Sequence, residues 1–186
     1  MNAMASVVGP YRTAFGPDGD LYVANAYQDR SQILRFAGTP DRHGRHPFRE
    51  VFVARHGGNR GLSHPFHVLF GPDGHLYVPS QDTDIVGRYH GPRATEGEPG
   101  TPMPHPSALA PWPAGTFHPG TFVPSTRQVR DGLRVVRHAI FGPDGRLAVA
   151  DRAAGAVKTY HLASGELDEV HAGGALTTPV HLLAWP

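Results

Sequence analysis

Phe15-Gly16-Pro17-Asp18-Gly19 is the first of three copies of one pentapeptide, and the other two occupy residues 70–74 and 141–145. A short apolar run precedes and follows each copy. Proline presets φ at the first turn position, aspartate accepts hydrogen bonds from the local backbone, and the last glycine tolerates the positive φ that closes the loop. Each copy therefore predicts a β-hairpin, and three identical hairpins indicate a repeat protein.

Two further β-prone runs follow each hairpin. The third run of each unit ends in an aromatic residue, and these runs cover residues 32–36, 84–89 and 156–160. The fourth run is expected at residues 48–53 in the first unit, near 117–123 in the second and at 166–170 in the third. Four antiparallel strands per repeat are typical of propeller blades. We therefore expect an all-β chain of about three blades.

These units set the expected domain boundaries. We expect a single propeller-type domain over residues 1–186, made of blade one (about 10–56), blade two (about 64–125), blade three (about 133–173) and an extra inner strand (179–186). Blade two carries an insert at residues 91–124, which holds nine of the nineteen prolines. Because proline cannot donate to a β-ladder, this insert is predicted to form an extended surface loop.

Composition excludes several classes of function. Charged residues make up 18% of the 186 residues and leave a formal net charge of +1 without a basic stripe, so neither nucleic acid nor a membrane is an expected partner. The absence of cysteine excludes a disulfide framework and thiolate chemistry. No signal peptide or membrane-spanning run is recognisable, so a cytoplasmic location is the default expectation. Met1 and Met4 are equally acceptable natural starts, and the second would make residues 1–3 foreign.

A lead-in segment before each hairpin, and a fourth at the end of the chain, places a polar residue at one repeat position. Two residues after a proline, or after its replacement Val136, stand Arg12, His67, His138 and His181. The lead-in forms the innermost strand of a blade, so these side chains are expected to converge on the central channel. Three neutral imidazoles suit zinc and leave an open coordination position, which would polarise a carbonyl or generate hydroxide. The alternative is a plain polar lining, bonded to water or to a neighbouring carbonyl.

A second set of polar residues ends the second strand of each unit, namely Asn25, Ser80 with Gln81, and Asp151. Oxygen ligands of these types suit calcium or magnesium. The alternative is that they cap the bend into the third strand by bonding backbone groups. The candidate channel or ligand-binding residues are therefore Arg12, Asn25, Gln81 and Asp151, and the catalytic residues are unknown.

The pattern Pro-x-x-x-x-Phe-Gly-Pro-Asp-Gly-x-Leu-Tyr-Val-Ala-Asn at residues 10–25 resembles the NHL repeat. It is also similar to the six-bladed propellers of the streptogramin lyase and gluconolactonase types. The resemblance covers nearly the whole chain apart from the insert, and it implies the fold more than the function. In the related peptidylglycine amidating lyases, inner-strand histidines hold a catalytic metal, a role that the resemblance would give to His67, His138 and His181. No matching catalytic base is present.

Three blades and one strand do not close a ring, because closed propellers have four to eight blades. The two open ends would expose apolar sheet faces and invite aggregation. Either two chains complete a six-bladed ring about a two-fold axis, or the chain is part of a longer polypeptide. A homodimer is the favoured expectation.

The sequence supports two classes of function. The first is a propeller that binds a small molecule in its His-lined channel, whose enzymatic version would be a lyase or hydrolase that depends on a divalent metal (zinc, calcium or magnesium). The alternative is a non-catalytic scaffold that uses the propeller face and the proline-rich loop. An inactive, truncated remnant of a larger propeller enzyme is a third expectation.

Overall fold

The computed structural model describes residues 7, 9–26, 31–106, 117–172 and 176–183. Within these residues the chain forms twelve β-strands. It contains no helix there that is long and apolar enough to cross a membrane. The strands form three separate four-stranded antiparallel sheets, each built from four consecutive strands. The predicted all-β architecture is confirmed.

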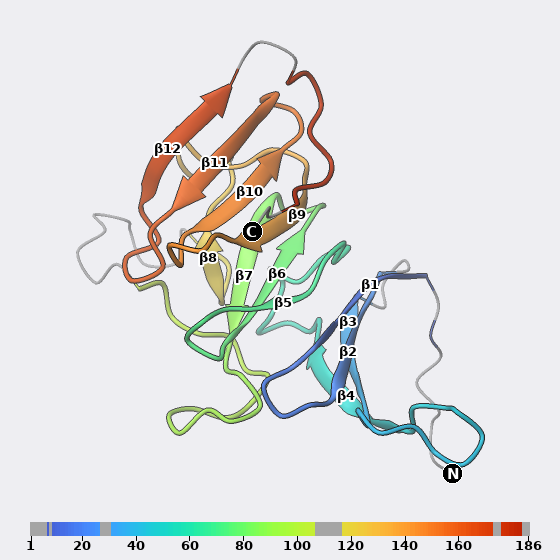
Figure 1. Ribbon diagram of the computed structural model, residues 1–186. Helices are drawn as coiled ribbons and strands as arrows, with labels where there is room; N and C mark the ends of the chain where they lie inside the picture. Colours follow the sequence, from blue (N-terminus) through green and yellow to red (C-terminus); the bar gives the residue numbers. More distant parts are fainter. Residues whose placement is uncertain (1–6, 8, 27–30, 107–116, 173–175, 184–186) are drawn as a thin grey trace.

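Each sheet follows the chain from its inner edge to its outer edge. The first sheet contains β1 (Pro10–Phe15), β2 (Leu21–Asn25), β3 (Gln32–Phe36) and β4 (Phe48–Ala54). The second contains β5 (Leu69–Phe70), β6 (Leu76–Ser80), β7 (Ile85–Tyr89) and β8 (Thr121–Val123). The third contains β9 (Val136–Phe141), β10 (Leu147–Asp151), β11 (Ala156–Tyr160) and β12 (Leu167–Ala172). Figure 1 shows the second sheet between the other two, as in three neighbouring blades.

The repeated pentapeptide forms the predicted hairpin turn in every blade. Its last glycine has a positive φ at Gly19 (82°), Gly74 (75°) and Gly145 (76°). In the first copy the Asp20 N–H donates to Asp18 Oδ1 at 3.3 Å, as the sequence rule requires. The turn aspartates are therefore structural residues.

The core fills the two spaces between neighbouring sheets. Side chains alternate along each strand, so each sheet turns one set of apolar residues toward its neighbour. The space between the first and second sheets holds Tyr22, Ala24, Ile33, Phe52, Val53, Leu62, Val68, Leu76, Val78 and Tyr89. The space between the second and third sheets holds Leu69, Tyr77, Val86, Phe122, Val123, Leu133, Val136, Ala139, Leu147, Val149 and Tyr160. Packing between blades therefore stabilises the fold, since burial of each large apolar side chain contributes about 1.5–3 kcal/mol.

The inner strand of the second blade is short. Only Leu69 and Phe70 belong to β5, while Pro65 forms an isolated bridge with Ser80. Neither Pro65 nor Pro79 has an N–H to donate, although the Phe66 N–H still donates to Pro79 O at 3.1 Å. The lead-in therefore runs beside β6 without forming a full ladder.

The prediction of an inner strand at residues 179–186 is wrong for residues 179–183, which form no strand. Residues 179–183 have no strand pairing, and 184–186 lie outside the described residues. The Leu182 N–H instead donates to the His138 side chain, so this segment lies next to the third blade without a backbone ladder. The fourth strand of blade two is shorter than expected and covers Thr121–Val123. Part of the proline-rich insert, residues 107–116, also lies outside the described residues.

Candidate functional site

The four lead-in residues Arg12, His67, His138 and His181 lie together on the inner side of the blades. The rings of His67 and His138 are stacked, with centroids 4.2 Å apart and an interplanar angle of 17°. The His181 ring meets His138 edge-on at 5.4 Å. A guanidinium nitrogen of Arg12 lies 2.7 Å from His181 Nδ1. The structure therefore brings side chains from the first blade, the second, the third and the end of the chain into one cluster, which we call the inner cluster.

Burial and positive charge keep two of these histidines neutral. Desolvation, followed by the neighbouring His138 and Arg12, lowers the pKa of His67 to about 3. Desolvation, followed by Arg12 and His181, lowers the pKa of His138 to about 4. At neutral pH the inner cluster therefore carries the charge of Arg12 beside the uncharged imidazoles of His67 and His138.

The hydrogen bonds of the inner cluster fit a metal poorly. His138 Nδ1 accepts from the Leu182 N–H at 3.2 Å, and His181 Nδ1 accepts from Arg12, which is always protonated. These bonds place the single ring hydrogen of a neutral His138 or His181 on Nε2, whereas the buried His67 Nδ1 has no hydrogen-bond partner among the described residues. Among the described residues no group of three or more His, Cys, Asp or Glu side chains is arranged to hold a metal ion. The three-histidine metal site therefore stays a prediction.

A second layer lies beside the inner cluster and was missed by the sequence analysis. Tyr11, Phe66 and Arg137 each directly precede the aligned lead-in residue of their blade, so the repeat alignment could have found them. The rings of Tyr11 and Phe66 lie 4.2 Å apart. The Arg137 guanidinium lies 4.8 Å from the centre of the Phe66 ring, which is a cation–π distance. Its Nε donates to Gln81 Oε1 at 2.7 Å. Gln81, a predicted channel residue, thus orients Arg137.

These two layers border a hollow of about 600 Å³. It is lined by Pro10, Tyr11, Arg12, Thr13, Phe66, Arg137, Val180 and His181. All four residues that precede the aligned lead-in position contribute to this lining. In the part of the chain that the structure describes, the lining includes two guanidinium groups and the rings of Tyr11 and Phe66 but no carboxylate. Neither Arg12 nor Arg137 forms an ion pair with a carboxylate in the described part of the chain.

The polar residues that end the second strands lie elsewhere. Asn25, Ser80 and Asp151 are completely buried and do not line the hollow. Asp151 Oδ1 accepts from the backbone N–H groups of Arg134 and Ala154, at 3.3 and 3.1 Å. These bonds support the capping alternative for Asp151. Of the candidate ligand-binding residues, Arg12 lines the hollow and Gln81 bonds to its Arg137, whereas Asn25 and Asp151 do neither.

No known family model and no curated protein matches the chain. Solved structures do match it in fold. Virginiamycin B lyase from Staphylococcus aureus, a catalytically inactive variant with quinupristin, is 11% identical with a TM-score of 0.51, and 93% of this chain covers 44% of that one. The periplasmic gluconolactonase of Pseudomonas aeruginosa is 20% identical with a TM-score of 0.53, over 91% of this chain and 44% of that one. A protein from Lactobacillus plantarum is 17% identical with a TM-score of 0.58, over 96% and 46%.

The chain spans less than half the length of each of these proteins. At such low identity the likeness concerns the fold and not the chemistry. The lyase and the gluconolactonase are members of six-bladed propeller families, and this chain supplies three four-stranded sheets. The protein therefore has the fold of a partial, three-bladed β-propeller.

Proposed function

We propose that the hollow binds a small organic anion, one that joins a carboxylate or phosphate group to a flat apolar part. The observation that carries this proposal is the pair of guanidinium groups, Arg12 and Arg137, in one hollow without a lining carboxylate. Arginine binds carboxylate and phosphate through geometrically matched, charge-assisted hydrogen bonds. Among the described residues, the exposed Arg12 bonds to His181 and the half-buried Arg137 bonds to Gln81, and neither partner is a carboxylate.

The aromatic pair supplies the apolar side of the hollow. Tyr11 and Phe66 lie in contact, and His64 stacks on Phe66 with ring centroids 4.8 Å apart. Flat apolar surfaces next to a few fixed polar groups are typical of small-molecule sites. The volume of about 600 Å³ lies within the roughly 300–1,000 Å³ common for such sites.

The lyase or hydrolase version of this function stays a prediction. It would place His67, His138 and His181 around a divalent metal, which requires the imidazoles to turn and the Arg12–His181 contact to break. The cationic Arg12 opposes a dication at this point, since like charges repel strongly where water is partly excluded. An anion meets no such opposition, which is why anion binding is the better supported function.

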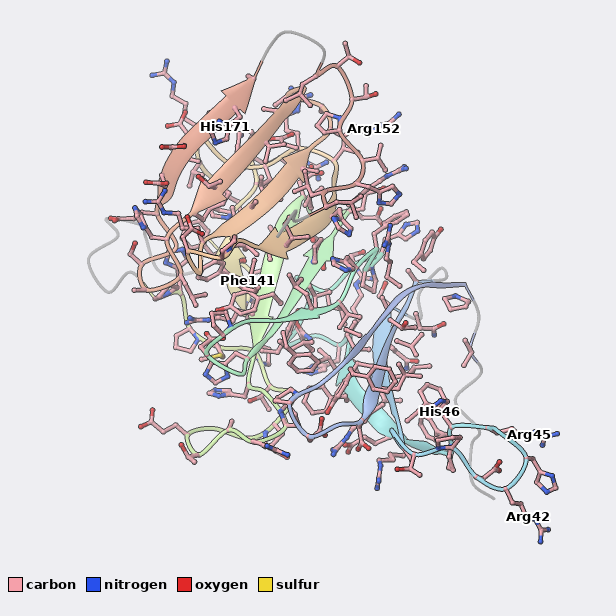
Figure 2. All side chains as sticks on the ribbon, in the orientation of Figure 1. Arg42, Arg45, His46, Phe141, Arg152 and His171 are labelled. Atoms are coloured by element: carbon pink, nitrogen blue, oxygen red, sulfur yellow. The ribbon has the colours of Figure 1, made fainter. Side chains whose placement is uncertain are left out.

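Calorimetric titration with matched pairs of probes tests the proposal. Benzoate and phenyl phosphate should bind, whereas their uncharged counterparts benzamide and phenol should bind at least ten times more weakly. Arg137→Met should weaken benzoate binding about 10- to 100-fold, since hydrogen bonds to charged groups contribute about 1.5–3 kcal/mol. Arg42→Met is the matched control, because Figure 2 shows Arg42 on a projecting loop and Arg42 does not line the hollow.

Two outcomes would contradict anion binding. If benzamide binds as tightly as benzoate, the guanidinium groups do not recognise the ligand. If no probe binds but zinc does, with a change in the NMR signals of His67, His138 and His181, the metal hypothesis replaces the anion hypothesis. If neither anions nor metals bind, a non-catalytic scaffold is the better description.

A further inference from the structure

The two contacts between blades use the same pair of aromatic side chains. The phenylalanine of one repeat packs edge-on against the tyrosine of the preceding blade. Phe70 meets Tyr22 with ring centroids 4.9 Å apart, and Phe141 meets Tyr77 at 5.1 Å. Figure 2 labels Phe141 at the side of the third sheet that approaches the second. This repeated contact defines how one blade docks on the next.

The close fit is also visible at the turn glycines. A Cβ atom added to Gly16 would lie 3.1 Å from the Phe70 ring tip, and one added to Gly71 would lie 3.1 Å from the Phe141 ring tip. Each phenylalanine ring therefore covers both the tyrosine and the first glycine of the preceding blade. A third contact of this kind requires an exposed phenylalanine on the first blade and an uncovered first turn glycine on the last blade.

The first blade provides the exposed phenylalanine. Phe15 is the repeat equivalent of Phe70 and Phe141, yet 62% of its surface is exposed, because no preceding blade covers it. The strand register places Phe15, Leu21, Phe36 and Phe48 in one row across the outward face of the first sheet. Phe48 and Val51 on this face are also exposed. The outward face of the first blade is therefore exposed at Phe15, Phe48 and Val51, whereas Val23 and Leu34 on the same face are buried.

The third blade provides the open acceptor. Ala148 occupies the position of Tyr22 and Tyr77 in its repeat. A hollow of about 430 Å³ lies over it, lined by Gly142, Pro143, Asp144, Arg146, Ala148, Thr159, Glu169 and His171. The three atoms nearest to a Cβ added at Gly142 all belong to its own turn, so no phenylalanine ring covers this glycine. The space that a tyrosine at position 148 and the phenylalanine of a following blade would fill is therefore open in the described structure.

We propose that Phe15 of a second copy of this chain occupies the hollow over Ala148. Each copy carries one donor face, on the first blade, and one acceptor face, on the third. Figure 1 shows these two sheets at opposite ends of the fan. Two copies can therefore form two identical contacts about a two-fold axis, and their six sheets close the ring.

The proposed partner follows from the fold and from the blade interfaces. The chain spans 44% to 46% of matching structures that include two six-bladed propellers, so a second copy supplies the missing number of blades. The new contact continues the two contacts already present within the chain. It also completes the channel, because the inner strands of the second copy close the side that the three blades leave open.

Light scattering on the purified full chain tests this contact. The wild-type mass should be about twice the 20.0 kDa of one chain. Phe15→Asp removes the donor ring and Ala148→Glu fills the acceptor with a charge, so each variant should be a monomer at the same concentration. Val170→Asp is the matched control, because Val170 is exposed on β12 but pairs with Lys158 on the opposite face from Ala148. It should stay a dimer.

Mixing the two monomeric variants gives the decisive result. The Phe15→Asp chain retains Ala148 and the Ala148→Glu chain retains Phe15, so the mixture has one intact contact and should form a heterodimer. Dimers of both single variants, or a mixture that stays monomeric, would overturn the proposal. A monomeric wild-type chain would overturn it as well and leave the hollow to another polypeptide segment. Circular dichroism checks that each variant is folded. If one variant does not fold, the mass of the other, compared with that of the Val170→Asp control, still tests the proposal.

Discussion

Lowering the pH from 7 to 5 is predicted to destabilise the protein through His67 and His138. Their pKa values in the folded protein are about 3 and about 4. In the unfolded chain a histidine has a pKa of about 6.5. The unfolded state therefore binds more protons than the folded state between these values, and stability falls as the pH drops below about 6.5. The groups that face the two rings are Arg12 and His181, and both favour the neutral form of His138.

The size of this effect follows from proton linkage. From pH 7 to pH 5, a histidine that stays neutral in the fold loses about 2 kcal/mol of stabilisation, so two such groups give about 4 kcal/mol as an upper limit. The inner cluster borders an open hollow, and solvent screening there reduces the effect to about 2 kcal/mol for the pair. For a chain of this length, that corresponds to a decrease in melting temperature of roughly 4–8 °C.

Urea denaturation at pH 7 and pH 5, at one protein concentration, measures this loss. His138→Gln keeps an acceptor for the Leu182 N–H but removes one titrating ring, so it should lose about 1 kcal/mol less than wild type between the two pH values. Arg42→Met, on an exposed loop outside both proposed sites, should behave as wild type. If His138→Gln shows the full wild-type pH dependence, or if NMR shows both rings titrating near their ordinary pKa, the electrostatic account of the inner cluster is wrong.

Two further predictions concern the scaffold. Lys158→Met should destabilise the fold by about 3–5 kcal/mol in urea denaturation. Lys158 Nζ lies 2.9 Å from Asp151 Oδ2, so the completely buried carboxylate would lose its counter-charge. The Lys158→Met/Asp151→Asn double variant should recover much of the lost stability, and its failure to do so would contradict the pairing. Gly91→Ala should lower the melting temperature, because a Cβ there would overlap the Gly74 carbonyl. Gly57→Ala is the control and should leave the melting temperature unchanged, because the space around Gly57 is open. Equal effects of the two substitutions would refute the steric reason.

The sequence was sufficient to predict the three blades because the fold depends on local turn chemistry that repeats. Gly19, Gly74 and Gly145 take the positive φ expected of them, and the strands begin or end within a few residues of the expected bounds. The strand predicted at residues 179–186 failed for a physical reason. A strand needs a neighbour that pairs with its backbone, and the described part of this segment finds only the His138 side chain.

The candidate site was predicted in part. The alignment of the lead-ins correctly singled out residues that meet in space, since Arg12 and His181 are in hydrogen-bond contact although 169 positions separate them. It could not predict which ring nitrogen accepts a hydrogen bond, because this depends on where Arg12 and the Leu182 N–H lie in the fold. Arg137 was not predicted, because the position before the aligned residue holds a different residue in each repeat.

A repeat protein allows one further argument from a single sequence. Positions at which the repeats agree, such as the turn glycines, perform the same structural task in each blade. Positions at which they differ mark the places where the blades have separate tasks. Arg12 replaces histidine, Arg137 replaces an aromatic residue, and Ala148 replaces tyrosine. The first two border the hollow near the inner cluster, and the third opens the acceptor on the last blade. The departures from the repeat thus coincide with the two sites proposed for function, which is expected if the shared residues build the fold and the divergent ones direct binding and assembly.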